Sequence, residues 1–212
     1  DRFATYQLGA NFDPDDTAPI QATITTMAWP GIPTGYDLVD HGYFLGSANQ
    51  LIVPDPTQGS GYAILTPGIP SGGYTEVFPF RVSSDGLFAG SARNSVTTYE
   101  PVVWRQSGTN PVTYAPEVVS TRESLIYGIG AAEAMWATEY ETYVLLGFVP
   151  DGGGGWEVGE LAGNNAQVEG VNADYFVGSY QLNSGNQGAA VWSTSDIDPS
   201  FAADFYPIPS AP

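Results

Sequence analysis

A short phrase of sequence recurs along this chain and limits its possible folds more than any other feature. Each copy contains an apolar run, a turn with an acidic residue or Gly, further apolar residues and a Gly-Ser step. The clearest copies are YDLVDHGYFLGS at 36–47, FRVSSDGLFAGS at 80–91 and VEGVNADYFVGS at 168–179. Because the apolar residues alternate in short runs between turn signals, each copy predicts paired β-strands.

The Gly-Ser step provides an alignment of the whole chain. Two more divergent copies join the three clear ones, and the steps are centred on Gly9, Gly46, Gly90, Ala137 and Gly178. A second apolar landmark follows each step, at Trp29, Ile64, Trp104, Leu146 and Trp192. A tight turn and another apolar run close each unit. About four short strands in roughly 40 residues is the size of a propeller blade.

The sequence therefore predicts an all-β fold, a β-propeller of about five four-stranded blades. Another repeat-built all-β barrel or sandwich is the alternative. At 212 residues the chain suits a single domain over 1–209, with 210–212 as a tail. The segment FAADFYPI at 201–208 is expected to complete the first unit, which lacks an innermost strand. The segment 130–141 has a helix-forming composition but falls in register with strands, so we expect a strand.

Two further expectations concern packing and loops. Trp104 and Trp192 end alternating runs at equivalent places, which predicts that both pack between adjacent sheets. The segments 48–61, 93–100 and 181–188 differ in length and composition, which predicts variable loops between second and third strands.

The segment VNADYFVGSYQLNSGNQGAAVW at 171–192 is similar to the HAF-type extracellular repeats of bacteria. In that pattern an Ile-Asn pair, a turn Gly, an apolar pair, Gly-Ser, a variable loop and Ala-x-x-Trp follow one another. The resemblance extends to 82–104 and to 38–64. It implies a secreted, propeller-like repeat protein, and it carries no catalytic residues with it.

Charge and composition exclude some partners. The formal net charge is -18, from 23 acidic residues and 5 basic residues, all of them Arg. A nucleic acid or an anionic membrane surface would be repelled at long range. No Cys is present, so neither disulfides nor thiolate metal sites are possible. Abundant Tyr, Thr, Ser and Gly without Lys favours an extracellular, cell-surface or periplasmic location.

The turns between first and second strands suggest a polar cluster near the propeller axis. Its predicted members are His41, Asp85, Glu133 and Asp174. Two carboxylates at a set separation would suit a glycoside hydrolase. Asp also stabilises tight turns by bonding its own backbone, and we favour this structural role. His41 is the single histidine, and no nucleophile-elbow sequence supports a catalytic triad.

A metal site and a ligand surface are the remaining candidates. Asp13, Asp15 and Asp16 offer oxygens of the kind that Ca²⁺ prefers, but their spacing does not match a calcium loop and a solvated acidic loop is favoured. No other cofactor is expected. Aromatic and amide side chains suited to glycan binding lie near predicted loops, with decoration of a β surface as the alternative. These residues are Tyr99, Tyr180, Asn94, Asn186 and Trp156.

The resulting expectation is a non-enzymatic binding or adhesion module at the cell surface, with a protein or glycan partner. One alternative is a structural or accessory subunit of an extracellular or membrane-associated assembly, joined through strand edges. A second alternative is a glycoside hydrolase that uses the axial carboxylates.

Overall fold

The structure is a computed structural model, and it describes residues 2–8, 22–28, 42–46, 49–59, 61–94, 98–163, 165–181, 187–195, 202–203 and 205–208. In these residues the chain forms five small sheets, which we number unit 1 to unit 5 in chain order. The described part contains strands and one short 3₁₀ turn but no α-helix. The prediction of an all-β fold is confirmed.

The first three units have two, three and four strands. Unit 1 is the hairpin of β1 (Arg2–Leu8) and β2 (Ala22–Ala28). Unit 2 contains β3 (Phe44–Gly46), β4 (Gln50–Pro54) and β5 (Tyr62–Leu65). Unit 3 contains β6 (Tyr74–Val82), β7 (Phe88–Asn94), β8 (Tyr99–Thr109) and β9 (Val112–Val118).

The last two units include strands from the C-terminal segment. Unit 4 contains β10 (Ser124–Ile129), β11 (Met135–Glu139), β12 (Leu145–Pro150), β13 (Trp156–Leu161) and the short β17 (Ala202–Ala203). Unit 5 contains β14 (Gln167–Val171), β15 (Tyr175–Gln181), β16 (Gln187–Ser193) and β18 (Phe205–Ile208). Within each unit the strands pair antiparallel in chain order, except that β17 pairs parallel with β13.

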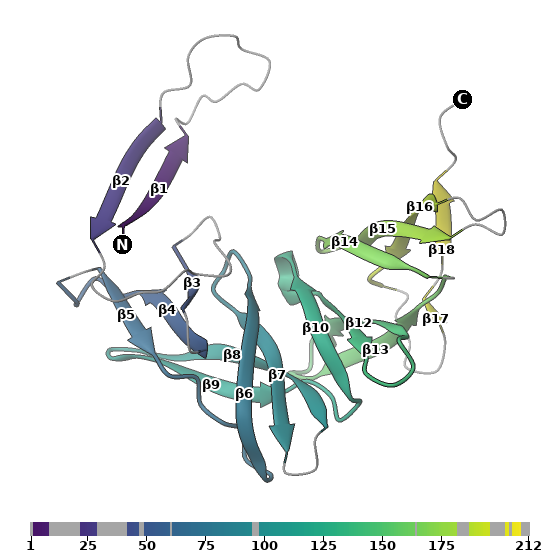
Figure 1. Cartoon of the computed structure of the whole chain (residues 1–212), viewed down its shortest axis with the longest axis horizontal. Helices are drawn as coiled ribbons and strands as arrows, with labels where there is room; N and C mark the ends of the chain where they lie inside the picture. The colour runs from purple at the N-terminus through teal and green to yellow at the C-terminus, as the bar shows by residue number, and fades with distance from the viewer. Residues whose placement is uncertain are drawn as a thin grey trace.

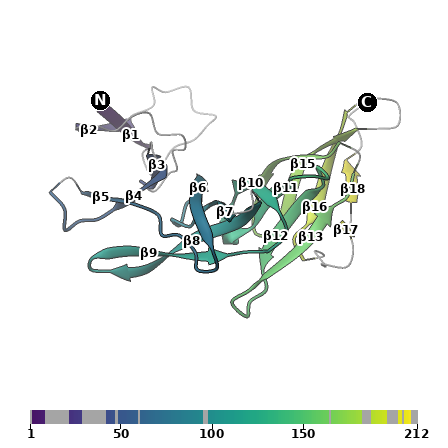
Figure 2. The same ribbon diagram turned by 60° about the horizontal axis from the view of Figure 1, so that its bottom comes forward.

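The units follow an open arc, with the β1–β2 hairpin at one end and unit 5 at the other (Figure 1). A view turned by 60° shows the same succession of sheets (Figure 2). The innermost strand β10 of unit 4 contacts β6, β7 and β8 of unit 3, and it also contacts β14 of unit 5. The sheets are therefore stacked side by side along the arc, but they do not close into a ring.

The C-terminal segment does not complete unit 1, so that prediction was wrong. Strand β18 pairs with β16 of unit 5, from Trp192 opposite Phe205 to Ala189 opposite Ile208. Pairing with the nearby open edge of unit 5 closes a much shorter loop than pairing at the far end of the chain, which costs less entropy. It also covers the edge of β16.

The Gly-Ser alignment is confirmed by strand register for three of its five steps, those of units 3, 4 and 5. In units 3, 4 and 5 the first strand has a bulge, and the residue paired just before the shift faces Gly90, Ala137 or Gly178. A Cβ atom at Gly90 would lie 2.0 Å from the Phe78 carbonyl oxygen, and one at Gly178 would lie 1.9 Å from the Gln167 carbonyl oxygen. The bulged neighbouring backbone thus leaves no room for a side chain at these two steps.

The second landmark needs correction in two units. Trp104 pairs with Phe88 and Trp192 with Phe176, but in unit 4 the equivalent pair is Phe148 with Met135, so Leu146 was the wrong position. In unit 2 the equivalent third strand is β4, and Ile64 belongs to the outer strand β5. The segment 48–61, expected to be one loop, therefore contains a strand. Its apolar run of three residues, Leu51 to Val53, is short enough to be mistaken for loop sequence.

The sheets of units 3 and 4 use both faces for packing. In unit 3, Phe88 and Trp104 pack toward unit 2, while Leu87, Ala89 and Val103 pack toward unit 4. A third apolar cluster, which includes Phe176 and Trp192, lies between units 4 and 5. The alternation follows from the two-residue period of a strand. It places the core in layers between successive sheets.

The two predicted anchor tryptophans lie between sheets, as expected, and both are fully buried. The Trp104 Nε1–H donates to the Gly68 carbonyl oxygen at 2.9 Å, and the Trp192 Nε1–H donates to the Ala162 carbonyl oxygen at 2.8 Å. Gly68 and Ala162 both lie in the connector that leads into the tryptophan's own unit. Units 3 and 5 therefore share not only their strand pairing but also an equivalent hydrogen bond from the tryptophan side chain. Trp29 lies outside the described residues.

Candidate functional site

Four aromatic rings form a continuous row across units 3 and 4. Phe78 and Phe80 of β6 are stacked, with ring centroids 6.4 Å apart and an interplanar angle of 11°. Tyr99, at the start of β8, lies 5.9 Å from Phe78 and also 5.9 Å from Tyr140, which follows β11. We call these four residues the aromatic row. Phe80 is 38% exposed and Tyr140 is 51% exposed, so the row reaches the surface at both ends.

Local strand geometry explains the row. Phe78 and Phe80 are two residues apart on β6 and share one face by strand alternation. Phe80 is the unpaired residue of the bulge, because Pro79 pairs with Gly90 and Arg81 with Ala89. A residue at a bulge is re-aimed and leaves the regular ladder. The same bulge that excludes a side chain at Gly90 thus presents Phe80 to solvent.

Charged and hydroxyl groups lie next to the row in the sequence and on the sheet. Glu76 precedes Phe78 by two residues on β6 and pairs with Arg93, with 3.4 Å between Glu76 Oε2 and Arg93 Nε. Glu100 follows Tyr99 and accepts a hydrogen bond from the Tyr74 hydroxyl. Burial, with help from Glu100, raises the pKa of Tyr74 to about 12, so this phenol stays a donor at neutral pH. The row therefore has polar neighbours of both charges.

A hydrogen bond between units 3 and 4 fixes the end of the row at Phe80. Arg81 donates from Nε to the Tyr127 carbonyl oxygen at 2.7 Å and from Nη1 to the Phe80 carbonyl oxygen at 2.8 Å. Tyr127 is the bulge residue of β10. Arg81 thus ties the bulge of unit 3 to the bulge of unit 4, next to Phe80.

The structure separates the ligand residues that the sequence grouped together. Tyr99 belongs to the aromatic row. Asn94 ends β7, and its N–H bonds to the Thr98 carbonyl oxygen at 3.4 Å. Tyr180 is partly buried against the core between units 4 and 5, and Trp156 donates to Glu117 Oε1 at 2.7 Å. Asn186 lies outside the described residues.

The predicted axial residues have structural partners where they are described. The Ser83 hydroxyl donates to Asp85, within a turn whose ends are joined by the Ser83 N–H and the Leu87 carbonyl oxygen at 2.9 Å. The Asp174 carbonyl oxygen accepts from the Thr194 N–H at 2.9 Å. The side-chain bond of Asp85 favours the turn-stabilising role for that residue, whereas the bond of Asp174 is made by its backbone. His41 lies outside the described residues.

The axial residues are also not fully equivalent, which corrects the alignment. Asp85 stands three residues before Phe88, whereas Glu133 and Asp174 stand two residues before Met135 and Phe176. The paired residues Phe88, Met135 and Phe176 fix the register, so Glu133 and Asp174 match each other and Asp85 is displaced by one position.

Glu133 takes part in an ion pair between units 3 and 4. Arg105 of β8 donates from Nη1 and Nη2 to the two oxygens of Glu133, with 2.8 Å between Nη2 and Oε2. The Arg105 Nε also lies 3.9 Å from Glu117 Oε2. The hydrogen bond to Glu133 is the main reason why the pKa of Arg105 is raised. We call this space between the turn ends of units 3 and 4 the first gap.

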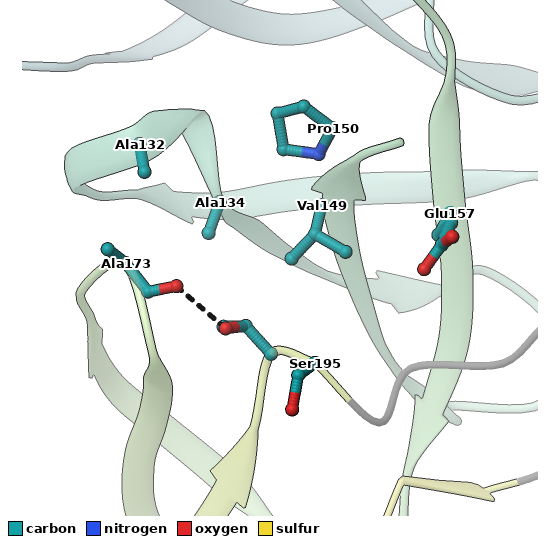
Figure 3. Close-up of a pocket in the computed structure, with 8 residues that line it drawn as sticks. Ala132, Ala134, Val149, Pro150, Glu157, Ala173 and Ser195 are labelled. Atoms are coloured by element: carbon teal, nitrogen blue, oxygen red, sulfur yellow. Dashed lines mark hydrogen bonds between the residues drawn. The ribbon is translucent and has the colours of Figure 1, made fainter. Parts of the chain in front are cut away.

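The matching space between units 4 and 5, the second gap, is open. It contains a cavity of about 300 Å³ (Figure 3). The lining residues come from both units: Ala132, Ala134, Val149, Pro150, Glu157, Ala173, Thr194 and Ser195. Small side chains thus leave space where the first gap holds a guanidinium.

The calcium candidates Asp13, Asp15 and Asp16 lie outside the described residues. In the part of the chain that the structure describes, no three His, Cys, Asp or Glu side chains are grouped as metal ligands would be. Within that part there is also no helix with the length and apolar character of a membrane span.

Sequence reasoning missed Phe78, Phe80 and Tyr140. A signal for the first two was present, since FPF places two aromatic residues on one face of a predicted strand. The approach of Tyr140 to Tyr99 depends on the packing of unit 4 against unit 3, which no local pattern encodes.

No protein-family model, no curated protein and no solved structure matches this chain significantly, and the similarity to HAF-type repeats stays a prediction.

Proposed function

We propose that this chain is a non-enzymatic glycan-binding module of a secreted or cell-surface protein, built on a propeller-like repeat of about five units. The aromatic row carries this proposal. It joins four rings from three separate elements and is exposed at both ends.

The row supplies the two kinds of contact that sugars need. A pyranose ring has a flat face of C–H groups, which packs on an aromatic face, and a rim of hydroxyls, which needs hydrogen-bond partners. Glu76 and Arg93 pair with each other on the face of the sheet that carries Phe78 and Tyr99, and they provide an acceptor and a donor beside the row. The net charge of -18 favours neutral glycans over acidic ones, since acidic glycans would be repelled at long range.

The repeat architecture supports the propeller part of the proposal. Units 3, 4 and 5 share the bulged first strand and the pairing of the second and third strands, and units 3 and 4 also share the packing on both faces. Such units are stabilised mainly by their neighbours, as in other repeat proteins. Variable surface residues such as the aromatic row are then free to carry binding.

Oligosaccharide binding with matched variants tests the function. The chain should bind neutral glycans on an array and in titrations followed by tyrosine fluorescence or NMR. Phe80→Ala and Tyr140→Ala should each weaken binding at least about fivefold, since one stacked ring is worth about 1 kcal/mol. Tyr143→Ala is the control, because Tyr143 is 82% exposed and lies outside the row. Absence of binding to neutral and acidic glycans, or an equal loss in the control, would overturn the proposal.

A second function, as a structural subunit of an extracellular assembly, is favoured by one observation. Tyr175 and Val177 of unit 5 are 47% and 43% exposed, whereas their counterparts in unit 3, Leu87 and Ala89, are 4% and 0% exposed beneath unit 4. An apolar sheet face of this kind suits a further sheet. Light scattering tests it: assembly that Val177→Glu abolishes supports the role, and a monomer at all concentrations contradicts it.

A further inference from the structure

The two gaps occupy equivalent places in the repeat. Trp104 and Phe148 are equivalent because they pair with Phe88 and Met135, so the residues that follow them, Arg105 and Val149, are equivalent too. On the opposite side of each gap stand Glu133 and Asp174, each two residues before the paired anchor of its unit. The first gap thus has an acid and a cation, and the second has an acid and valine.

The acidic character of the second gap is reinforced by Glu157. Of the eight lining residues, Glu157 is the one with an ionisable side chain, and it extends from β13 toward the cavity (Figure 3). The Thr194 hydroxyl already donates to the Ala173 carbonyl oxygen at 2.7 Å. Asp174 stands beside this pair, at the rim, because its carbonyl oxygen accepts from the Thr194 N–H. One carboxylate, that of Glu157, therefore lines a space whose equivalent contains a guanidinium, and the backbone of Asp174 lies next to it.

The other residues that unit 4 contributes to the cavity have small side chains. Ala132, Ala134, Val149 and Pro150 form the side of the cavity that belongs to unit 4. A volume of about 300 Å³ is at the lower end of the range for small-molecule sites. A small cation on a short alkyl stem fits this space, because the stem can lie between small side chains while the charge meets the Glu157 carboxylate.

None of the arginines whose side chains are described is available to fill the second gap. Each of these four already contacts a carboxylate or a carbonyl oxygen: Arg81, Arg93, Arg105 and Arg122. The surplus of acidic residues also raises the local concentration of cations around the molecule.

One strained turn contributes to both gaps. Ala132 and Glu133 adopt left-handed backbone conformations, with φ of 56° and 64°. Ala132 lines the second gap, and Glu133 binds Arg105 in the first. Consecutive non-glycine residues in this region are unfavourable and persist where their surroundings fix them, often at ligand sites.

We propose that the second gap is a binding site for a small organic cation, an amine or guanidinium on a short alkyl stem. The cation takes the place that Arg105 occupies in the first gap. A free alkylamine or alkylguanidine and an arginine side chain of a peptide share this chemistry.

Calorimetric titration of the full chain tests the site with four probes: agmatine, n-butylamine, N-acetyl-arginine amide and the uncharged 1-butanol. The cations should bind with 1:1 stoichiometry, and butanol should bind at least tenfold more weakly. Agmatine carries two positive charges, so the comparison that counts is between the two monocations: tighter binding of n-butylamine points to a free cation, and tighter binding of N-acetyl-arginine amide points to a peptide. Equal binding of butanol, or no saturable heat with any probe, would overturn the site.

Three variants locate the site. Glu157→Gln should weaken agmatine binding at least fivefold, and Val149→Arg should abolish it by filling the cavity with the residue of the first gap. Glu141→Gln is the control, because Glu141 is an exposed acid in the loop between β11 and β12 and not a lining residue. If Val149→Arg fails to fold, Glu157→Gln still tests the site, because Glu157 is exposed and its substitution should not disturb folding. Unchanged binding in Glu157→Gln would overturn the proposal.

Discussion

The first and second gaps are built on one pairing register, yet the protein fills one with its own arginine and leaves the other open. Arg105 reaches across from unit 3 to Glu133 of unit 4, while Val149 at the equivalent position leaves a cavity against unit 5. The difference shows how a repeat protein varies. The scaffold fixes where a side chain lies, and a single residue then decides whether the space becomes a structural contact or a cavity.

The largest expected effect on stability comes from removing Trp192, which is buried between the two units that form the second gap. Trp192→Ala should destabilise the chain by about 3 to 5 kcal/mol, since it removes a fully buried ring and its bond to the Ala162 carbonyl oxygen. Urea unfolding followed by fluorescence measures this. Tyr143→Ala, at an exposed position, should change stability by less than about 0.5 kcal/mol. If Trp192→Ala kept full stability but lost ligand binding, the tryptophan would be a recognition residue and not an anchor.

Opening the first gap should have a smaller effect. Arg105→Ala should cost about 1 kcal/mol, because the Arg105 side chain is 45% exposed and that of Glu133 is 22% exposed, so solvent weakens the pair. The variant also leaves the first gap with an acid and no cation, as in the second gap. Millimolar agmatine should therefore restore part of the melting temperature of Arg105→Ala by binding to the native state.

The double variant Arg105→Ala, Glu133→Gln provides the control for this rescue, because its first gap lacks the carboxylate that would hold agmatine. Equal recovery in the single and double variants would show that agmatine acts elsewhere.

A third, smaller effect is expected at an ion pair of unit 4 that belongs to neither gap. Arg122 bonds to Glu139 at 2.5 Å, and this hydrogen bond is the main reason why the pKa of Glu139 is lowered from 4.5. A carboxyl whose folded pKa is lowered adds stability above its unfolded pKa and loses that stability as pH falls through the folded pKa. The stability difference between wild type and Glu139→Gln should be at most about 1 kcal/mol at pH 7, and it should shrink below pH 4. A difference that is constant with pH would contradict the assignment.

The smallest expected effect is that of salt on the whole chain. With a net charge of -18, self-repulsion should be relieved by screening over about 10 Å at 0.1 M NaCl, so the melting temperature should rise by a few degrees. Screening also weakens the ion pair of the first gap, so Arg105→Ala should show a slightly larger rise than wild type. A flat or falling melting temperature would mean that the acids are too dispersed to repel one another.

The sequence identified those parts of the fold that local sterics determine. The Gly-Ser step was found because a Cβ atom at Gly90 or Gly178 would lie about 2 Å from the bulged backbone, so only glycine fits these positions. The burial of Trp104 and Trp192 was predicted from their place at the end of alternating runs. Position 148 was missed because no tryptophan marks it and because its hairpin is shorter: Phe148 follows its partner Met135 by 13 residues, whereas Trp104 and Trp192 follow Phe88 and Phe176 by 16.

The candidate sites were only partly predictable for a different reason. Tyr99 was proposed, but the aromatic row exists because unit 4 brings Tyr140 against unit 3, and the gaps exist because two sheets meet at their turn ends. Both features depend on the arrangement between units. Glu133 was placed in the right turn, yet its partner Arg105 lies 28 residues away and on another sheet.

The indole bonds of units 3 and 5 also have a mechanical consequence. In these two units an indole bond ties the connector to the sheet that it enters, through Gly68 and Ala162. Unit 4 has Phe148 at the equivalent position, which offers no N–H, and its connector is tied by Arg122 to Glu139 and Glu160 instead. A chain pulled from its ends would thus have two joints held by buried neutral bonds and one held by exposed ionic bonds. Acid or high salt would weaken only the ionic connection, at the entry to unit 4. Solvent conditions would therefore determine which connection breaks first under force.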